Sequence, residues 1–140
     1  MQKEEVEMGG GGGEAQMEIV GKAFVKHYYG LFDAGSRPAL AGLYHPSTSI
    51  LSFEGRRFDG ADSIGRHLSE LPFDLCRHMV ATVDCQGSPF AAGGILVFVT
   101  GSLQLSGEEH SLSFSQMFQL VQTTEGRFYV QNDIFRLNYG

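Results

Sequence analysis

Residues 95–105 (ILVFVTGSLQL) and 112–121 (LSFSQMFQLV) decide the fold, because apolar side chains recur in both at every second position. This spacing is that of a β-strand, in which successive side chains point to opposite faces of the sheet. Runs of the same kind occupy 76–85 and 128–137, and turn-forming residues separate neighbouring runs. The pattern predicts four long antiparallel strands, and Gly101 within one of them predicts a bulge or sharp bend.

Apolar residues before position 72 follow the three- and four-residue spacing of helices. A first helix is expected from about Ala15 to Asp33, and short strands are expected over 49–58. Ser36 is the expected N-cap of a short second helix, and Asp59 is the expected N-cap of a third. The apolar faces of the first and third helices are formed by Val20, Phe24, Tyr28, Leu31 and Phe32, and by Ile64, Leu68 and Leu71.

Both faces of the predicted sheet carry apolar side chains at 95–99 and at 114–121. An antiparallel sheet with one face in water alternates cleanly, so the second face needs a cover of its own. At about 25 cal/mol per Å², leaving it wet would forfeit several kcal/mol. We therefore predict an α+β fold with helices on one face of a curved antiparallel sheet, and a homodimer that pairs the other faces. The residues expected at the dimer interface are His78, Met117 and Ile134.

Strict alternation assigns each strand residue to a face. It places His78 on the polar face of its strand, and it places Val130 and Ile134 together on one face. Cys76 and Cys85 fall on opposite faces, because nine residues separate them. At ~3.3 Å per residue they lie roughly 30 Å apart, whereas a disulfide needs Cα atoms within about 7 Å. Two free thiols are therefore predicted.

Two further polar residues have structural roles in this interpretation. Tyr29 follows Tyr28 on the first helix and is expected at the surface or the rim, because Tyr28 already lies on the apolar stripe. Asp133 is expected to pair with an arginine, with Arg136 as the nearest candidate in the last strand.

The chain has 140 residues, a formal net charge of −6 and 42% apolar residues, which fits one globular domain. An excess of acids disfavours nucleic-acid binding, because phosphate contacts require basic surfaces. The first residues lack a signal peptide's apolar segment, and no apolar run is long enough for a membrane span. Three glutamates followed by five glycines predict a disordered acidic, Gly-rich leader over 1–14 and one folded domain over 15–140.

Phe53-Glu54-Gly55 is the most informative triplet for function. A carboxylate directly behind an aromatic residue is either a general base in a pocket or an acid presented to a basic partner. The five histidines show no metal-ligand spacing and no nucleophile motif is present, so no metal, cofactor or catalytic set is predicted. Glu108 and Glu109 lie in a predicted turn, either merely solvated or as part of an acidic docking patch with Glu54.

Five motifs in register over residues 17–140 resemble the nuclear transport factor 2 family. They are Phe24-Val25-Lys26-His27-Tyr28-Tyr29-Gly30-Leu31-Phe32-Asp33, Phe53-Glu54-Gly55, Leu71-Pro72-Phe73, Ser115-Gln116-Met117-Phe118 and Asn132-Asp133-Ile134-Phe135-Arg136-Leu137. Residues 83–86 and 103–110 look like the plant branch of this family. The resemblance implies a cone-shaped α+β fold and a homodimer, in agreement with the strand pattern.

The same resemblance implies a transport adaptor rather than an enzyme. Family members bind the small GTPase Ran in its GDP form and touch Phe-x-Phe-Gly repeats of nucleoporins, which implies a location in cytoplasm and nucleus with enrichment at the nuclear pore. By motif match Phe53 lines a cavity and Glu54 receives a lysine of Ran, with Glu108 and Glu109 as further acids. Met17 lies where animal members carry a repeat-binding aromatic residue, and Phe53 stands where they have Trp.

Two alternatives stay open at this point. The same cone fold hosts ketosteroid isomerases and dehydratases, in which Glu54 would be a base whose pKa is raised by apolar walls. A relative that acts in RNA export or as a scaffold would instead form a heterodimer through the same sheet. No cofactor, nucleic-acid partner or membrane insertion is expected.

Overall fold

The computed structural model describes residues 10–71, 76–88 and 93–138. Its helices are α1 (Gly10–Asp33), α2 (Arg37–Leu40) and α3 (Ala61–Ser69), with a short 3-10 helix over Ala41–Leu43. Its strands are β1 (Ile50–Phe53), β2 (Arg56–Asp59), β3 (Cys76–Gly87), β4 (Ile95–Leu105), β5 (Leu112–Gln122) and β6 (Phe128–Asn138). Among the described residues, no helix has both the length and the apolar character needed to cross a membrane.

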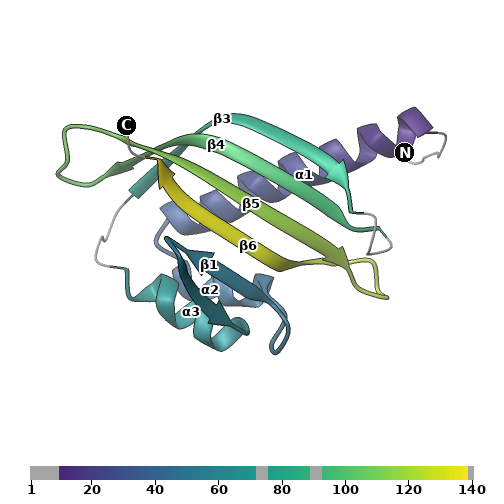
Figure 1. The fold of residues 1–140 in the computed structure, drawn as a ribbon, viewed down its shortest axis with the longest axis horizontal. Helices are drawn as coiled ribbons and strands as arrows, with labels where there is room; N and C mark the ends of the chain where they lie inside the picture. Colours follow the sequence, from purple (N-terminus) through teal and green to yellow (C-terminus); the bar gives the residue numbers. More distant parts are fainter. Residues whose placement is uncertain (1–9, 72–75, 89–92, 139–140) are drawn as a thin grey trace.

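The strands form one sheet in the order β2-β1-β6-β5-β4-β3. Strand β1 runs parallel to β6, and every other neighbouring pair is antiparallel. Helix α1 lies along one face of the long strands, while α2 and α3 lie near β1 and β2 (Figure 1). The sheet curves without closing into a barrel. The predicted α+β class, with a curved antiparallel sheet and helices on one face, is confirmed; the parallel β1–β6 pair is an addition.

Aromatic side chains of α1 fill the space between the helix and the sheet. Tyr28 and Phe118 are almost fully buried, and their ring centroids lie 4.9 Å apart in an edge-on arrangement. Phe24 packs on Phe118 at the same centroid distance. Each such pair adds about 0.5–1.5 kcal/mol beyond the area it buries. On the strands, Val97 and Val99 are fully buried and Phe98 between them is 44% exposed, as alternation along a strand predicts.

The helical part of the chain starts earlier and buries more than the sequence predicts. Helix α1 begins at Gly10, ahead of the predicted start at Ala15, and residues 1–9 of the predicted leader lie outside the described residues. Tyr29, expected at the rim, is only 4% exposed. Tyr28 and Tyr29 both face the sheet, so the apolar stripe of α1 is wider than a three- and four-residue spacing indicates.

A β-bulge in β3 breaks the predicted alternation. The register between β3 and β4 shifts between Val80 and Thr82, beside Gly101 of β4. A Cβ atom at Gly101 would collide with the carbonyl oxygen of Met79, so the close approach of the two backbones requires glycine here. The bulge predicted from Gly101 is therefore confirmed, although the extra residue lies in the neighbouring strand.

The bulges move several side chains to faces that strict alternation does not predict. Cys76 and Cys85 both pack toward the core instead of on opposite faces, and both are free thiols. The His78 side chain is 3% exposed and faces inward, so its predicted place at the dimer interface is wrong. A second register shift, between β5 and β6, buries Val130 but leaves Ile134 45% exposed on the outer face.

Helix α3 is capped by Gly60 rather than by the predicted Asp59. Gly60 has φ 83° and ψ 154°, and a Cβ atom there would lie 2.6 Å from the carbonyl oxygen of Pro46. Only glycine tolerates both conditions. Asp59 instead ends β2 and accepts two hydrogen bonds from the Arg57 guanidinium, at 2.8 and 3.1 Å. The predicted inward face of α3 is confirmed at Ile64, which is fully buried.

Candidate functional site

The turn between β1 and β2 places Glu54 at one end of the sheet. Phe53 and Arg56 pair across the turn, so Glu54 and Gly55 form a two-residue hairpin loop. Both loop residues have positive φ, 51° for Glu54 and 86° for Gly55, as a type I′ turn requires. Glutamate is an uncommon residue in this conformation, and its side chain is held here by a bond to the neighbouring strand.

The Glu54 side chain is held by the backbone of β6. The Leu137 N–H donates a hydrogen bond to Glu54 Oε2 at 2.6 Å, and the Glu54 N–H donates to the Phe135 carbonyl at 3.1 Å. Strand β1 pairs with β6 only as far as Phe135. The Glu54 carboxylate therefore accepts a backbone N–H of β6 that a longer β1 would have bound. Oε1 has no hydrogen-bond partner among the described residues, and it remains available at the surface.

Behind the turn lies an apolar cavity of about 80 Å³, here called the inner cavity. It is lined by Tyr28, Phe32, Leu51, Phe53, His78, Leu103, Leu105, Leu112, Gln116, Phe135 and Leu137. Phe53 forms part of its wall and stacks on Phe135, with ring centroids 4.7 Å apart and planes inclined by 14°. The predicted cavity position of Phe53 is therefore observed, and Glu54 lies outside this cavity, on the other side of the Phe53 wall.

A larger and more open groove of about 520 Å³ lies between the β1–β2 hairpin and α3, here called the outer groove. It is lined by Phe53, Glu54, Arg56, Phe58, Ser63, Arg66, His67, Glu70 and Leu71. Phe53 separates it from the inner cavity, since its side chain lines both. Phe53 and Glu54 can be identified from the sequence. Arg56, Arg66 and His67 cannot, because no motif links α3 to the hairpin before the chain folds.

The other predicted acids lie at the same end of the sheet. Glu108 and Glu109 are exposed in the connection between β4 and β5. This connection begins beside Leu105, whose carbonyl accepts the Glu108 N–H at 3.1 Å, and Leu105 lines the inner cavity. Leu137, which binds Glu54, pairs with Phe114 shortly after the same connection. Folding thus places at one end of the sheet two acidic groups that are more than fifty residues apart in sequence.

Met17 lies at the opposite end. Its sulfur approaches Gly87, the last residue of β3, and its side chain is partly buried against the core. Gly87 pairs with Ile95, where β4 begins, and Ile95 pairs with Leu120 near the end of β5. The turn between β1 and β2 lies beside the end of β6, which pairs with the start of β5 (Figure 1). The two predicted binding surfaces are therefore separated by the length of the sheet.

The outer face of the sheet carries a row of apolar side chains across three strands, Phe98, Met117 and Ile134. Met117 pairs with Phe98 of β4 on one side and with Ile134 of β6 on the other. Phe98 is 44% exposed and Ile134 is 45% exposed. Met79 and Val80 add further exposed apolar surface on β3. Helix α1 covers the opposite face, so this row has no cover among the described residues.

Under the inner cavity lies a buried chain of hydrogen bonds around Asp133. Asp133 is 1% exposed and accepts from the Tyr44 hydroxyl at 2.7 Å and from Gln116 Nε2 at 2.8 Å. Gln116 Oε1 accepts from the Tyr29 hydroxyl, and Tyr44 contacts the Tyr28 hydroxyl at 3.1 Å. Burial raises the pKa of Asp133 to about 7. The predicted pairing of Asp133 with an arginine is wrong, because its side chain points into the core.

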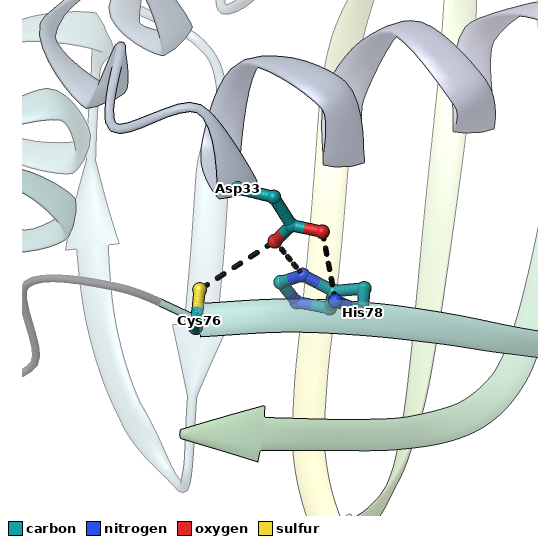
Figure 2. Close-up of side chains that lie close together, drawn as sticks. All are labelled: Asp33, Cys76 and His78. Atoms are coloured by element: carbon teal, nitrogen blue, oxygen red, sulfur yellow. Dashed lines mark hydrogen bonds and ion pairs between the residues drawn. The ribbon is translucent and has the colours of Figure 1, made fainter. Parts of the chain in front are cut away.

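Figure 2 shows a second polar cluster, where the end of α1 meets the start of β3. Asp33 accepts the backbone N–H of His78 at 2.8 Å, pairs with His78 Nδ1 at 2.6 Å, and accepts from Cys76 Sγ at 3.5 Å. These are metal-ligating residue types, with their ligand atoms within 4.8 Å of one another. They already satisfy each other, however, and burial followed by the nearby Asp33 raises the pKa of Cys76 to about 12. The cluster joins α1 to β3.

Fold and site together define a class, the nuclear transport factor 2-like proteins: open α+β cones with an aromatic-walled cavity at one end of a curved sheet. The family model for the nuclear transport factor 2 domain matches residues 20–137. The chain is 57% identical to "Nuclear transport factor 2B" of Arabidopsis thaliana over 122 residues, covering 87% of this chain and 94% of that protein. It is 56% identical to "Nuclear transport factor 2" of Oryza sativa subsp. japonica, covering 88% and 98%.

A solved structure agrees with these sequence matches. Nuclear transport factor 2 from Cryptosporidium parvum superposes with a TM-score of 0.81 at 41% identity, covering 88% of this chain and 95% of that one. The chain belongs to the nuclear transport factor 2 family. The predicted resemblance is confirmed, and the identities with two plant relatives agree with the predicted plant-type character. The names of these relatives support a role in nuclear transport.

Proposed function

We propose that this protein is a nuclear import adaptor that binds Ran in its GDP form and Phe-x-Phe-Gly repeats of nucleoporins. In this proposal Phe53, Glu54, Glu108 and Glu109 contact Ran, and Met17 contacts the repeats. The protein acts without a cofactor as a homodimer and moves between cytoplasm and nucleus, with enrichment at the nuclear pore. The names of the relatives support nuclear transport in general, and the geometry of the Glu54 turn supports the specific partner.

The observation that carries the proposal is the fixed carboxylate of Glu54 beside an aromatic-walled cavity. The Leu137 N–H holds one carboxylate oxygen at 2.6 Å, so little side-chain entropy remains to be lost when a lysine binds the other. Glu108 and Glu109 add negative charge at the same end of the sheet. Such an acidic rim steers a basic partner and fixes its orientation more than it adds affinity.

The family resemblance implies that a phenylalanine of Ran enters the inner cavity, and this requires the cavity to widen. The cavity measures about 80 Å³, whereas an apolar cavity of about 150 Å³ is known to hold benzene. Phe53 is the wall between this cavity and the outer groove, so rotation of its ring joins the two spaces. Phenylalanine is smaller than the Trp of animal members, so Phe53 leaves more of the cavity free.

The two surfaces lie at opposite ends of the sheet, which supports simultaneous binding of cargo and pore repeats. Met17 packs beside Gly87, and Glu54 adjoins the end of β6. The apolar row Phe98, Met117 and Ile134 supports the homodimer, because pairing two such faces would remove its exposed apolar area from water.

The alternative of an isomerase or dehydratase requires a base that reaches a substrate in the inner cavity. Glu54 lines the outer groove and binds the β6 backbone, so its position favours a docking role over catalysis. A carbonyl substrate that is turned over by the protein, with turnover lost in Glu54→Gln, would reverse this order.

A capture assay with Ran loaded with GDP or GTP tests the proposed function. We expect capture of the GDP form alone. Glu54→Lys is expected to weaken it at least a hundredfold, because a lysine would then face a lysine and such like-charge contacts cost several kcal/mol. Glu125→Lys is the matched control, since Glu125 is exposed in the β5–β6 turn at the other end of the sheet. Equal capture of both nucleotide forms, or unchanged affinity of Glu54→Lys, would contradict the assignment.

A further inference from the structure

His67, which lines the outer groove, has a buried ring nitrogen that nothing in the described part of the chain satisfies. His67 Nε2 is inaccessible to solvent and has no partner there. Leaving a buried polar atom unpaired costs about 1–3 kcal/mol, so such atoms in folded proteins usually have a ligand or a functional reason. The unpaired nitrogen singles out the groove that His67 lines as a candidate binding site.

The His67 ring is fixed by two aromatic side chains. Phe58 stacks on it with ring centroids 4.1 Å apart, and Phe53 meets it edge-on at 4.7 Å. Burial, and then the charge of Arg56, lower the pKa of His67, while Glu70 opposes the shift. The ring is therefore neutral near pH 7 and adds no positive charge to the groove.

Two arginines flank the same groove without an acidic partner in the described residues. Arg56 lies with its guanidinium carbon 5.3 Å from the centre of the Phe58 ring, and Arg66 is on α3. The neighbouring Arg57 differs, since Asp59 binds it through two hydrogen bonds. Guanidinium groups match the geometry of a carboxylate, and they hold it through paired charge-assisted hydrogen bonds.

We propose that the outer groove binds a carboxylate group, supplied by an acidic side chain of the docked protein close to the lysine that Glu54 receives. Arg56 and Arg66 provide the charge, and the His67 ring forms the wall of the groove beside them. That the acid comes from the docked protein rests on the proposed function, whereas the carboxylate site itself does not. Glu54 and the arginines thus form a rim of alternating charge, which selects a partner segment carrying an acid and a base side by side.

The site is tested with N-acetylglutamate as the probe and N-acetylglutamine as its uncharged counterpart. The ring signals of His67, assigned from their loss in His67→Gln, are followed by NMR on the full chain at pH 7. We expect saturable shifts with N-acetylglutamate only. The double variant Arg56→Gln/Arg66→Gln is expected to weaken this binding at least tenfold, while Arg57→Gln changes it less than twofold. Urea unfolding checks that all variants remain folded.

Two results would overturn the carboxylate site. Equal shifts with both compounds would show that charge is not recognised, and equal losses in the Arg56/Arg66 and Arg57 variants would show only a general effect of net charge. Retention of the shifts in the double variant would likewise remove the arginines from the site.

Ran loaded with GDP tests where the acid comes from. If the groove takes an acid of the partner, Arg56→Gln/Arg66→Gln weakens binding of Ran about tenfold. If the arginines merely offset the charge of Glu54, the same change strengthens binding, because the rim becomes more acidic. Strengthened or unchanged binding therefore overturns this part. Failure of the wild-type protein to bind Ran would refute the proposed function, and the N-acetylglutamate result would still decide the carboxylate site.

Discussion

Asp133 is the acid whose replacement tests the buried network under the inner cavity most directly. Its carboxylate is 1% exposed and is held by Tyr44 and Gln116 without a cation among its hydrogen-bond partners in the described structure. Burial raises its pKa from 3.8 to about 7. The native state therefore keeps a proton on Asp133 that the unfolded chain releases near pH 4.

The sign of the pH dependence follows from this difference. Between about pH 4 and pH 7 the native state binds more protons than the unfolded state, so the free energy of unfolding falls as the pH rises. The pKa difference corresponds to about 4 kcal/mol at 1.36 kcal/mol per pH unit. Below pH 4 and above pH 7, Asp133 no longer makes the free energy of unfolding depend on pH.

Asp133→Asn should remove the contribution of residue 133 to the pH dependence of stability and keep the buried hydrogen bonds intact. The asparagine oxygen can accept from Gln116 Nε2, and its NH₂ group can donate to the Tyr44 hydroxyl, which then donates to Tyr28. Relative to wild type, the variant should gain stability steadily from pH 4.5 to pH 7.5, by a few kcal/mol in total.

Urea unfolding at several pH values measures the effect, with Glu125→Gln as a control acid that is exposed in a turn. The control should keep the wild-type pH dependence. The reasoning is refuted if Asp133→Asn and wild type show parallel stability curves over this range, since burial would then not raise the pKa of Asp133.

Three further predictions concern the proposed dimer, the backbone and the proposed repeat-binding surface at Met17. Phe98→Asp should convert a dimer into a monomer in sedimentation at micromolar concentration, because it puts a charge into the centre of the apolar outer face; wild-type protein that sediments only as a monomer would contradict the interface. Gly60→Ala should cost about 2–4 kcal/mol in urea unfolding from strain and the clash with Pro46, whereas Gly42→Ala, with open space around it, should be within about 1 kcal/mol of wild type. Met17→Ala should weaken binding of a Phe-x-Phe-Gly peptide several-fold while capture of Ran is unchanged; equal repeat binding would remove Met17 from that surface.

The sequence predicts the elements well where local periodicity is strong. The alternation over 95–105 and 112–121 identifies long strands, and Gly101 marks a bulge, because these signals depend on neighbouring residues only. The parallel pairing of β1 with β6 has no such signal, since it joins segments about eighty residues apart. Alternation also misplaces His78. The bulge in β3 shifts the residues that follow it by one position, so counting across the bulge assigns His78 to the wrong face. Its contact with Asp33 of α1 is a tertiary contact that no local pattern predicts.

The candidate site divides in the same way. Phe53, Glu54 and the acids at 108–109 can be identified from motifs, because residue type and order carry that information. Only the folded chain shows that Leu137 fixes the Glu54 carboxylate. The sequence by itself therefore determined the fold class, the family and the acidic half of the site. Tertiary structure decided its basic half, since Arg56, Arg66 and His67 become one groove only when α3 packs beside the hairpin and buries a ring nitrogen with no partner there.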